Sequence, residues 1–577
     1  MGSRFFWTIL YLSKSQILYR AIRLIKSTLL KQIIVTSTMR NSGPNPIKGI
    51  RLINKINLLF KNNPHNGKFI FLNKEVIYSS NKINWNDPNQ EKLWLYNLHY
   101  FDYLIPLCQN PNQENFETIK KIIGDWIDKN PIGRGNGWEP YSLSLRIVNW
   151  IFVYSAYNNS FKKEEPFESK FLKSLYQQAN YLTYFVEYHI QANHLFTNFK
   201  ALVFAGLFFN NLKWLNMFVP KIINEIKEQI LPDGGHYERS PMYQNIIITD
   251  FIDLVNIIYS LDKTLPDNVK SLKELLEEKL KKMMVWQNRI LQPDGEVPLL
   301  GDSAFQIALK SQSLQQYYDL VVKKKWGSGK QNQVSSLTNS GYHVFRSDDQ
   351  YLVFDTGELG VSYQPGHAHC DILSFEYSYK TERFFVDTGV GNYLENEVRL
   401  KARSIYAHNT AVVNEMDQAQ LWKAFRMAKR VSDISSNKDE NWVEGSYENK
   451  IDRGRKYHHS RKIELIDHKF FALQDTISSA RLTSLEFLFH LAPGSKIDIE
   501  NNQAKITIGN KTIVLIWESK LNPQLKDWFY TPEFGKIIPT KMLSFVPKVI
   551  KEGTYSFIIS PFGNQKEAND YFKDSLN

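Results

Sequence analysis

The chain has 577 residues, of which 43% are hydrophobic and 14% aromatic, and its formal net charge is +12 at pH 7. This length exceeds the size at which a single hydrophobic core stops growing, so we expect two or more domains. Residues 1–60 hold ten Lys or Arg and no Asp or Glu. The remainder is therefore close to neutral, which excludes a uniformly basic nucleic-acid-binding surface and gives no reason to expect a nucleic-acid partner.

The N-terminal segment combines apolar and basic residues. Residues 5–12 are mostly apolar, but Lys14 ends the run, and the stretch is too short to span a bilayer. Only Arg4 precedes it, with no clear small-residue cleavage site, so we expect no signal peptide. Residues 18–29 place apolar residues at helical spacing among basic ones. They predict an amphipathic helix that either packs on its own domain or makes peripheral contact with a membrane surface.

The pattern then divides the chain. We expect residues 1–90 to be the basic arm followed by an irregular lead-in with one or two short strands. Residues 91–325 show apolar residues at helical spacing, separated by turn signals, and predict a domain of antiparallel helix pairs. The segments with the clearest helical pattern are 143–157, 169–190, 198–212, 218–230, 244–261 and 267–290.

A polar, glycine-containing linker is expected at 326–335. From residue 336 to 577 the apolar period changes to two, which predicts strands and an antiparallel β-sandwich. The predicted strands are 341–347, 351–356, 373–379, 383–387, 462–467, 469–475, 484–490 and 504–517. The two cysteines, Cys108 and Cys370, indicate no disulfide framework.

The run Gly366–Asp371 carries two histidines, His367 and His369, two residues apart. On a strand they would point to the same face, whereas a turn or bulge would splay them. One ring then faces a cleft while the other turns toward a metal. Asp387 and His408 are the residue types that would complete a zinc site with His369. The alternative is that these three hydrogen-bond one another without a metal.

A second group of candidates lies upstream, at Asn193, His194 and Tyr243. An amide, imidazoles and a phenol fit proton abstraction beside a carboxylate better than hydrolysis. A hydrolase would need two carboxylates across the cleft, and Glu139 and Glu238 are the attractive candidates, which would leave the histidines without a role. The structural alternatives are that Asn193 caps a helix and that Tyr243 only packs.

Three further residues are candidates for substrate binding. Trp138 would stack on a sugar, and Arg146 would pair with a carboxylate, with a buried structural ion pair as the alternative. Arg239 is the third candidate, with a local ion pair to Glu238 as its alternative.

In this order, the motifs resemble the heparinase II/III-like polysaccharide lyases, the superfamily that includes heparin/heparan sulfate lyases and oligoalginate lyases. The segments that carry the resemblance are Asn193-His194, Asp233–Tyr243, Gly366–Phe375, Asp387–Gly389 and Ala407–Val413. Two others, Tyr11–Tyr19 and Leu93–Tyr103, resemble the branch found among bacterial surface-polysaccharide genes.

The resemblance implies an incomplete (α/α) toroid followed by an antiparallel β-sandwich, and β-elimination at a uronic acid. Asn193 and His194 would neutralise the substrate carboxylate. Tyr243 or His367 would remove the C5 proton, according to the side of the ring on which that proton lies, and Tyr243 would protonate the departing O4. Because a phenol has a high reference pKa, it needs a cationic setting to act as the base. Tyr393 would enter the cleft from the sandwich side.

The resemblance also implies a mainly structural zinc ion on His369, Asp387 and His408, and an acidic polysaccharide as the partner. It places the protein in the cell envelope or periplasm. Without a clear secretion signal, the cytoplasm or an inner-membrane-associated position is the alternative. The rival functions are a uronyl C5-epimerase and a non-catalytic polysaccharide-binding or assembly protein, and no particular oligomeric state is predicted.

Overall fold

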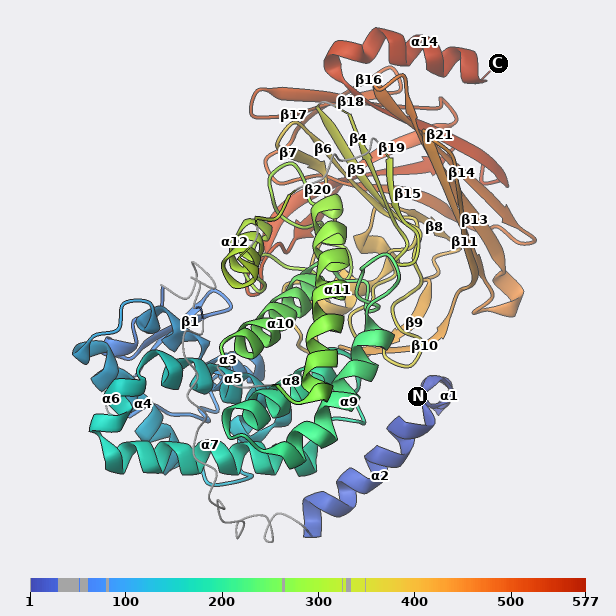
Figure 1. Cartoon of the computed structure of the whole chain (residues 1–577). Helices are drawn as coiled ribbons and strands as arrows, with labels where there is room; N and C mark the ends of the chain where they lie inside the picture. Colours follow the sequence, from blue (N-terminus) through green and yellow to red (C-terminus); the bar gives the residue numbers. More distant parts are fainter. Residues whose placement is uncertain are drawn as a thin grey trace.

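The computed structural model describes residues 2–29, 51, 61–78, 82–261, 265–323, 325–327, 334–347 and 349–576. Within these residues, a helical part precedes a part built of antiparallel sheets (Figure 1). The predicted class is confirmed: an incomplete (α/α) toroid is followed by a β-sandwich. Most of the predicted linker at 326–335 lies outside the described residues.

Helices that are close in sequence pack against one another in the toroid. Contacts join α5 to α7 and α8, α8 to α9, and α10 to α11. The helices of this part are α3 (Lys92–Tyr100), α4 (Gln113–Lys129), α5 (Pro140–Ala156), α6 (Asn158–Lys163), α7 (Glu165–Phe185), α8 (Ala192–Phe208), α9 (Leu212–Gln229), α10 (Pro241–Tyr259), α11 (Asp267–Ile290) and α12 (Ser311–Val322).

Most helices begin a few residues before the predicted positions, and the starts of α8 and α10 carry candidate site residues. Helix α10 begins at Pro241, where Ser240 is the N-cap and accepts a hydrogen bond from the Tyr243 backbone N–H, and proline suits the first helical position. Helix α8 begins at Ala192, six residues before the predicted 198, and its N-cap Gln191 (φ 69°) and its first residue Ala192 (φ 53°) both have positive φ. Non-glycine residues in this region are strained, which is common near functional sites.

Three larger antiparallel sheets and the two-stranded β10-β9 sheet form the C-terminal part. The strand orders of the larger sheets are β3-β4-β5-β6-β7, β11-β12-β13-β14-β21-β18-β17-β16 and β19-β20-β15-β8. The strands of the first sheet are β3 (Val334–Leu337), β4 (Tyr342–Arg346), β5 (Gln350–Asp355), β6 (Phe375–Tyr379) and β7 (Glu382–Phe385). The later strands are β8 (Ala411–Val413), β9 (Ala419–Trp422), β10 (Arg426–Arg430), β11 (Ser432–Lys438), β12 (Trp442–Asn449), β13 (Tyr457–Ile466), β14 (Phe470–Ser479), β15 (Leu485–His490), β16 (Lys496–Glu500), β17 (Gln503–Ile508), β18 (Lys511–Trp517), β19 (Leu521–Tyr530), β20 (Ile538–Pro547) and β21 (Gly553–Pro561).

The single strand predicted at 504–517 is wrong, because this segment is a hairpin. Strands β17 and β18 pair antiparallel around Gly509 and Asn510, and Gly509 has φ 57°. Glycine and asparagine tolerate the left-handed conformations that two-residue hairpin turns require. Two helices also occur in this part, α13 (Glu397–Arg403) and α14 (Gln565–Leu576).

Apolar clusters join the two parts. Trp286 and Ile290 of α11 pack on Tyr342, Val344 and Val353 of the first sheet. A second cluster brings the start of α10 against loops of the sandwich, and its fully or nearly buried members are Met242, Tyr243, Ala304, Val390 and Phe534. Burial of apolar surface across the junction therefore holds residues of both parts in one site.

Two helices of the N-terminal arm lie beside this body, α1 (Gly2–Tyr11) and α2 (Lys14–Leu29) (Figure 1). The lead-in contributes one hairpin, β1 (Lys68–Phe71) with β2 (Lys74–Ile77). Among the described helices, none has both the length and the apolarity needed to cross a membrane.

Candidate active site

A tyrosine of the toroid and a histidine of the sandwich form the centre of the site. The rings of Tyr243 and His367 stack with their centroids 3.9 Å apart. The Tyr243 hydroxyl lies 3.1 Å from the hydroxyl of Tyr393, which comes from a sandwich loop. Burial, and then the neighbouring Tyr393, raise the pKa of Tyr243 well above 10. Three predicted site residues, Tyr243, His367 and Tyr393, thus meet at the junction of the two parts. The Tyr243 phenol, with its raised pKa, is protonated at neutral pH.

The two histidines of the motif splay apart. Residues 366–371 form turns and irregular backbone and no strand. Asp302 holds both rings, since its Oδ2 lies 2.8 Å from Nδ1 of His367 and its Oδ1 lies 2.8 Å from Nε2 of His369. If His367 donates its Nδ1 proton to Asp302, its Nε2 is left to accept a proton.

Asp302 is itself paired with a cation. Its Oδ2 accepts a hydrogen bond of 2.9 Å from the Arg399 guanidinium. Burial opposes ionisation of Asp302, but Arg399 and the histidines outweigh burial and hold the pKa of this carboxyl well below its usual range. The anchor of both histidines is therefore a charged carboxylate.

Asn193 and His194 lie in the first turn of α8. Gln191 occupies the N-cap position and makes no side-chain cap hydrogen bond, so Asn193 is not the helix cap. His194 Nδ1 lies 3.2 Å from Oε2 of Glu187, and its ring packs on Tyr141 at 4.4 Å between centroids. Burial alone would lower the pKa of His194, but the Glu187 carboxylate reverses the effect and raises it above the usual 6.5.

Glu238 faces the same region and is 2% exposed. Among the described residues, neither of its carboxylate oxygens has a full hydrogen bond, and Nε2 of His367 is 4.0 Å away. Burial raises the pKa of Glu238, while His367, His194 and the backbone N–H of Asn193 act to lower it. The site therefore holds a buried acidic group whose charge is only partly compensated.

The predicted substrate-binding role of Arg239 is not supported, and its alternative ion pair with Glu238 is not formed. The Arg239 guanidinium donates to backbone carbonyls of Ser340 and Gly360 and lies 3.5 Å from Glu358. It therefore ties the toroid to sandwich loops.

The sugar-stacking role predicted for Trp138 is wrong. Its side chain is 4% exposed, packs against Trp126 and Tyr181, and donates its indole N–H to the carbonyl of Asn130. A ring enclosed in this way offers no face to a sugar. The apolar run that follows it already indicated that this segment enters the core.

Arg146 is fully buried and does not reach a substrate. It bonds to Gln178 and to the carbonyls of His99 and Gly137, and its guanidinium lies 3.9 Å from the Trp126 ring. Arg146 is therefore a buried structural residue, but the ion pair expected as its alternative is not formed, because the hydrogen-bond partners are neutral.

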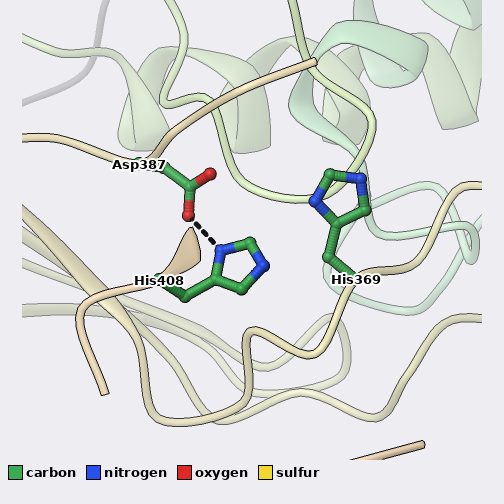
Figure 2. Close-up of side chains that lie close together, drawn as sticks. All are labelled: His369, Asp387 and His408. Carbon is green, nitrogen blue, oxygen red and sulfur yellow. Dashed lines mark hydrogen bonds and ion pairs between the residues drawn. The ribbon is translucent and has the colours of Figure 1, made fainter. Parts of the chain in front are cut away.

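The predicted metal ligands form a buried cluster of donors. One ligand atom each from His369, Asp387 and His408 lie within 4.8 Å of one another, and Asp387 Oδ2 is 2.6 Å from His408 Nδ1 (Figure 2). Among the described residues, His369 Nδ1 and His408 Nε2 are buried without a hydrogen-bond partner. Two imidazoles and a carboxylate are donors typical of zinc, so the residues fit that ion.

Gly389 orients Asp387 of this cluster and lets the backbone pass close to Thr531. The Gly389 N–H donates to Asp387 Oδ1 at 3.0 Å. Gly389 has φ 74°, and a Cβ at this position would lie 2.6 Å from the carbonyl oxygen of Thr531. Any larger residue would displace the backbone that orients Asp387.

Sequence reasoning did not find Asp302, Arg399, Glu187 and Tyr141. The only available signal was for Asp302, which stands in a polar Gly301-Asp302-Ser303 triplet directly after an apolar run. Arg399 and Glu187 occur in ordinary charged helical or turn sequence. Their contacts span 97 and 7 residues respectively.

Comparison with known families identifies the chain. Residues 54–325 match the family described as Heparinase II/III N-terminus, and residues 329–555 match Heparinase II/III-like, C-terminal. These two regions account for most of the chain, which therefore belongs to the heparinase II/III-like family.

Individual relatives agree with this assignment. A heparin-sulfate lyase of Pedobacter heparinus is 25% identical over 504 residues, which covers 78% of this chain and 72% of the relative. One from Bacteroides thetaiotaomicron is 22% identical and covers 75% of this chain and 67% of the relative. The crystal structure of heparinase III superposes with a TM-score of 0.71 at 18% identity and covers 95% and 91% of the two chains. The similarity supports a polysaccharide lyase.

Proposed function

We propose that this protein cleaves a uronic-acid-containing polysaccharide by β-elimination. The observation that carries the proposal is the stacked pair Tyr243–His367, contributed by two domains, together with Glu238, on which His367, His194 and the Asn193 backbone N–H all act. Elimination needs a neutralised carboxylate, a base at C5 and an acid at O4, and this junction offers a group for each.

Neutralisation of the carboxylate falls to Asn193 and His194. The Asn193 amide is a neutral hydrogen-bond donor. His194 supplies positive charge, because Glu187 favours its imidazolium form. A hydrogen-bonded and charge-compensated carboxylate makes the adjacent C5 proton more acidic, since it accepts the negative charge that develops in the transition state.

His367 is the base in our assignment, and Tyr243 is the acid. Asp302 at Nδ1 orients the His367 ring so that Nε2 accepts the C5 proton. The C5–H electron pair forms the C4–C5 double bond, and the C4–O4 bond breaks. The departing oxygen takes the phenol proton of Tyr243, which its raised pKa keeps in place. For Tyr243 to act as the base, the substrate would have to bring about formation of a phenolate.

The stacked arrangement also suggests the stereochemistry. Two rings 3.9 Å apart present their reactive edges from one wall, which suits removal of a proton and an oxygen from the same face of the sugar. In glucuronate the C5 hydrogen and O4 lie on one face, whereas in iduronate they lie on opposite faces. We therefore expect glucuronate-type residues to be preferred. An epimerase needs acid and base on opposite faces of C5, so the arrangement favours the lyase.

The buried cluster of His369, Asp387 and His408 is assigned a structural zinc ion. When bound, the ion would cross-link the turn after β5, the end of β7 and the turn before β8. The proposed elimination uses no step at this cluster.

The test is the ultraviolet absorbance of a 4,5-unsaturated uronate when the protein is incubated with a panel of uronate polymers. Paired oligosaccharides that differ only at C5 test the stereochemistry. Absorbance that rises with wild type but not with Tyr243→Phe supports the lyase. No rise, together with solvent deuterium entering C5, would establish the epimerase. Binding with neither reaction would indicate a binding protein.

A further inference from the structure

The helices α1 and α2 are attached to the body by one face only. Gln16 donates to the carbonyls of Ile190 in the toroid and Tyr363 in the sandwich, both at 3.3 Å. Tyr19 stacks on Tyr188 at 4.4 Å. The contacts of α1 with the β9–β10 hairpin include Trp422 to Thr8, Lys429 over Trp7 and Arg430 over Tyr11. The inner face is therefore specific and bridges both domains.

The outer face of the same helices is apolar and uncovered. Six large apolar side chains within fourteen residues are 38% to 59% exposed, and they are Phe5, Phe6, Ile9, Leu10, Ile17 and Leu18. On α1 their spacing of one, three and one residues forms a single stripe, opposite to the docked side chains. Single exposed apolar residues are ordinary, but a stripe of this kind usually meets another apolar medium.

The charge around the stripe has one sign. The sequences of α1 and α2 contain Arg4, Lys14, Arg20, Arg23 and Lys26 and no Asp or Glu. Arg4 and Lys14 are exposed beside the apolar residues, and Arg4 also donates to the carbonyl of Leu421 at 3.4 Å. Two copies meeting through this face would bring these cations together, which disfavours self-association. An anionic lipid surface instead attracts the cations and admits the apolar stripe below its headgroups.

We propose that the outer face of α1 and α2 docks the protein onto an anionic membrane leaflet, with the helices lying in the plane of the headgroups. Because the inner face contacts both domains, docking would fix the orientation of the Tyr243–His367 site relative to the membrane. This inference does not depend on the proposed lyase activity.

The experiment is flotation of the full-length protein with vesicles of phosphatidylcholine alone or mixed with phosphatidylglycerol. We expect binding only to the anionic vesicles, and weaker binding at high salt. The variant with Phe5→Gln, Phe6→Gln, Ile9→Gln and Leu10→Gln should bind about tenfold or more weakly, because glutamine keeps helix propensity and removes the apolar stripe.

The matched control replaces four exposed apolar residues of the sandwich, Leu525, Ile537, Val549 and Phe562, with glutamine and should float like wild type. Thermal melts establish that both variants are folded. The proposal is overturned if wild type does not float with anionic vesicles, or if both variants float equally well. It is also overturned if light scattering finds a wild-type dimer that the α1 variant dissociates, since a second copy then covers the stripe.

Discussion

His367 and His369 are two residues apart and share one carboxylate, yet they lie in different surroundings. The His367 side chain is 11% exposed and stacks on Tyr243 at the junction of the two parts, whereas His369 is fully enclosed and faces His408. The same residue type, on the same carboxylate, is thus partly open to solvent in one case and enclosed in the other. The comparison teaches that solvent access is what distinguishes the histidine to which we assign the proton transfer from the one to which we assign the metal.

The largest expected effect is at Tyr243, which stacks on the more exposed histidine, His367. Tyr243→Phe removes the acid, and we expect the rate of unsaturated-uronate formation to fall by roughly 10²–10⁴-fold with little change in melting temperature. Tyr237→Phe is the matched control, since Tyr237 is also buried but pairs with Tyr363. Equal losses in the two variants would mean that Tyr243 only packs.

Asp302→Asn should lower both the stability of the protein and its activity, because Asp302 contacts both histidines. It leaves Arg399 buried without its carboxylate, which costs about 3–5 kcal/mol of stability, and it frees the tautomer of His367, so that activity falls as well. Urea denaturation and initial rates measure the two effects. Asp294→Asn is the control, because Asp294 pairs with Arg383 away from the cleft. A stable but inactive Asp302→Asn protein would show that Asp302 is needed for activity and does not stabilise the fold.

The two histidines themselves should separate activity from stability. We expect His367→Gln to lose activity and to melt like wild type. His369→Gln should melt at a lower temperature, and chelation should lower the melting temperature of wild type but not of this variant, because a bound ion stabilises the folded state. Mass spectrometry under native conditions should detect zinc in wild type. If chelation leaves the wild-type melt unchanged, the cluster is a hydrogen-bonded one without metal.

The smallest expected effect is a shift in pH dependence through Glu187. Because the pKa of His194 is raised above 6.5, its charge and the stability of its ion pair are present below that pH and are lost as the pH rises through the higher folded pKa. Glu187→Gln should therefore move the alkaline limb of kcat/KM to lower pH. Glu168→Gln, which alters a carboxylate bonded to Tyr154, should not move it. An unchanged limb would show that His194 charge is not needed.

The sequence by itself determined the class of fold, the order of the domains and the candidate residues of the junction. The spacing of apolar residues is a property of neighbouring positions, so the change from helices to strands could be predicted. The motifs identified Asn193, His194, Tyr243 and His367 as candidates. A turn that lies between two strands of similar apolar pattern was not recognised. Residues 504–517 were therefore predicted as one strand, although they form the β17–β18 hairpin.

Only the tertiary structure decided which side chains are accessible and which partners they meet. Trp138 and Arg146 have residue types suited to sugar binding, but they are enclosed by helices distant in sequence. Asp302 unites two histidines more than sixty residues away. Burial and electrostatic pairing depend on how segments far apart in the sequence pack together. The residues next to a side chain in the sequence therefore do not show whether it is buried or which partner it meets.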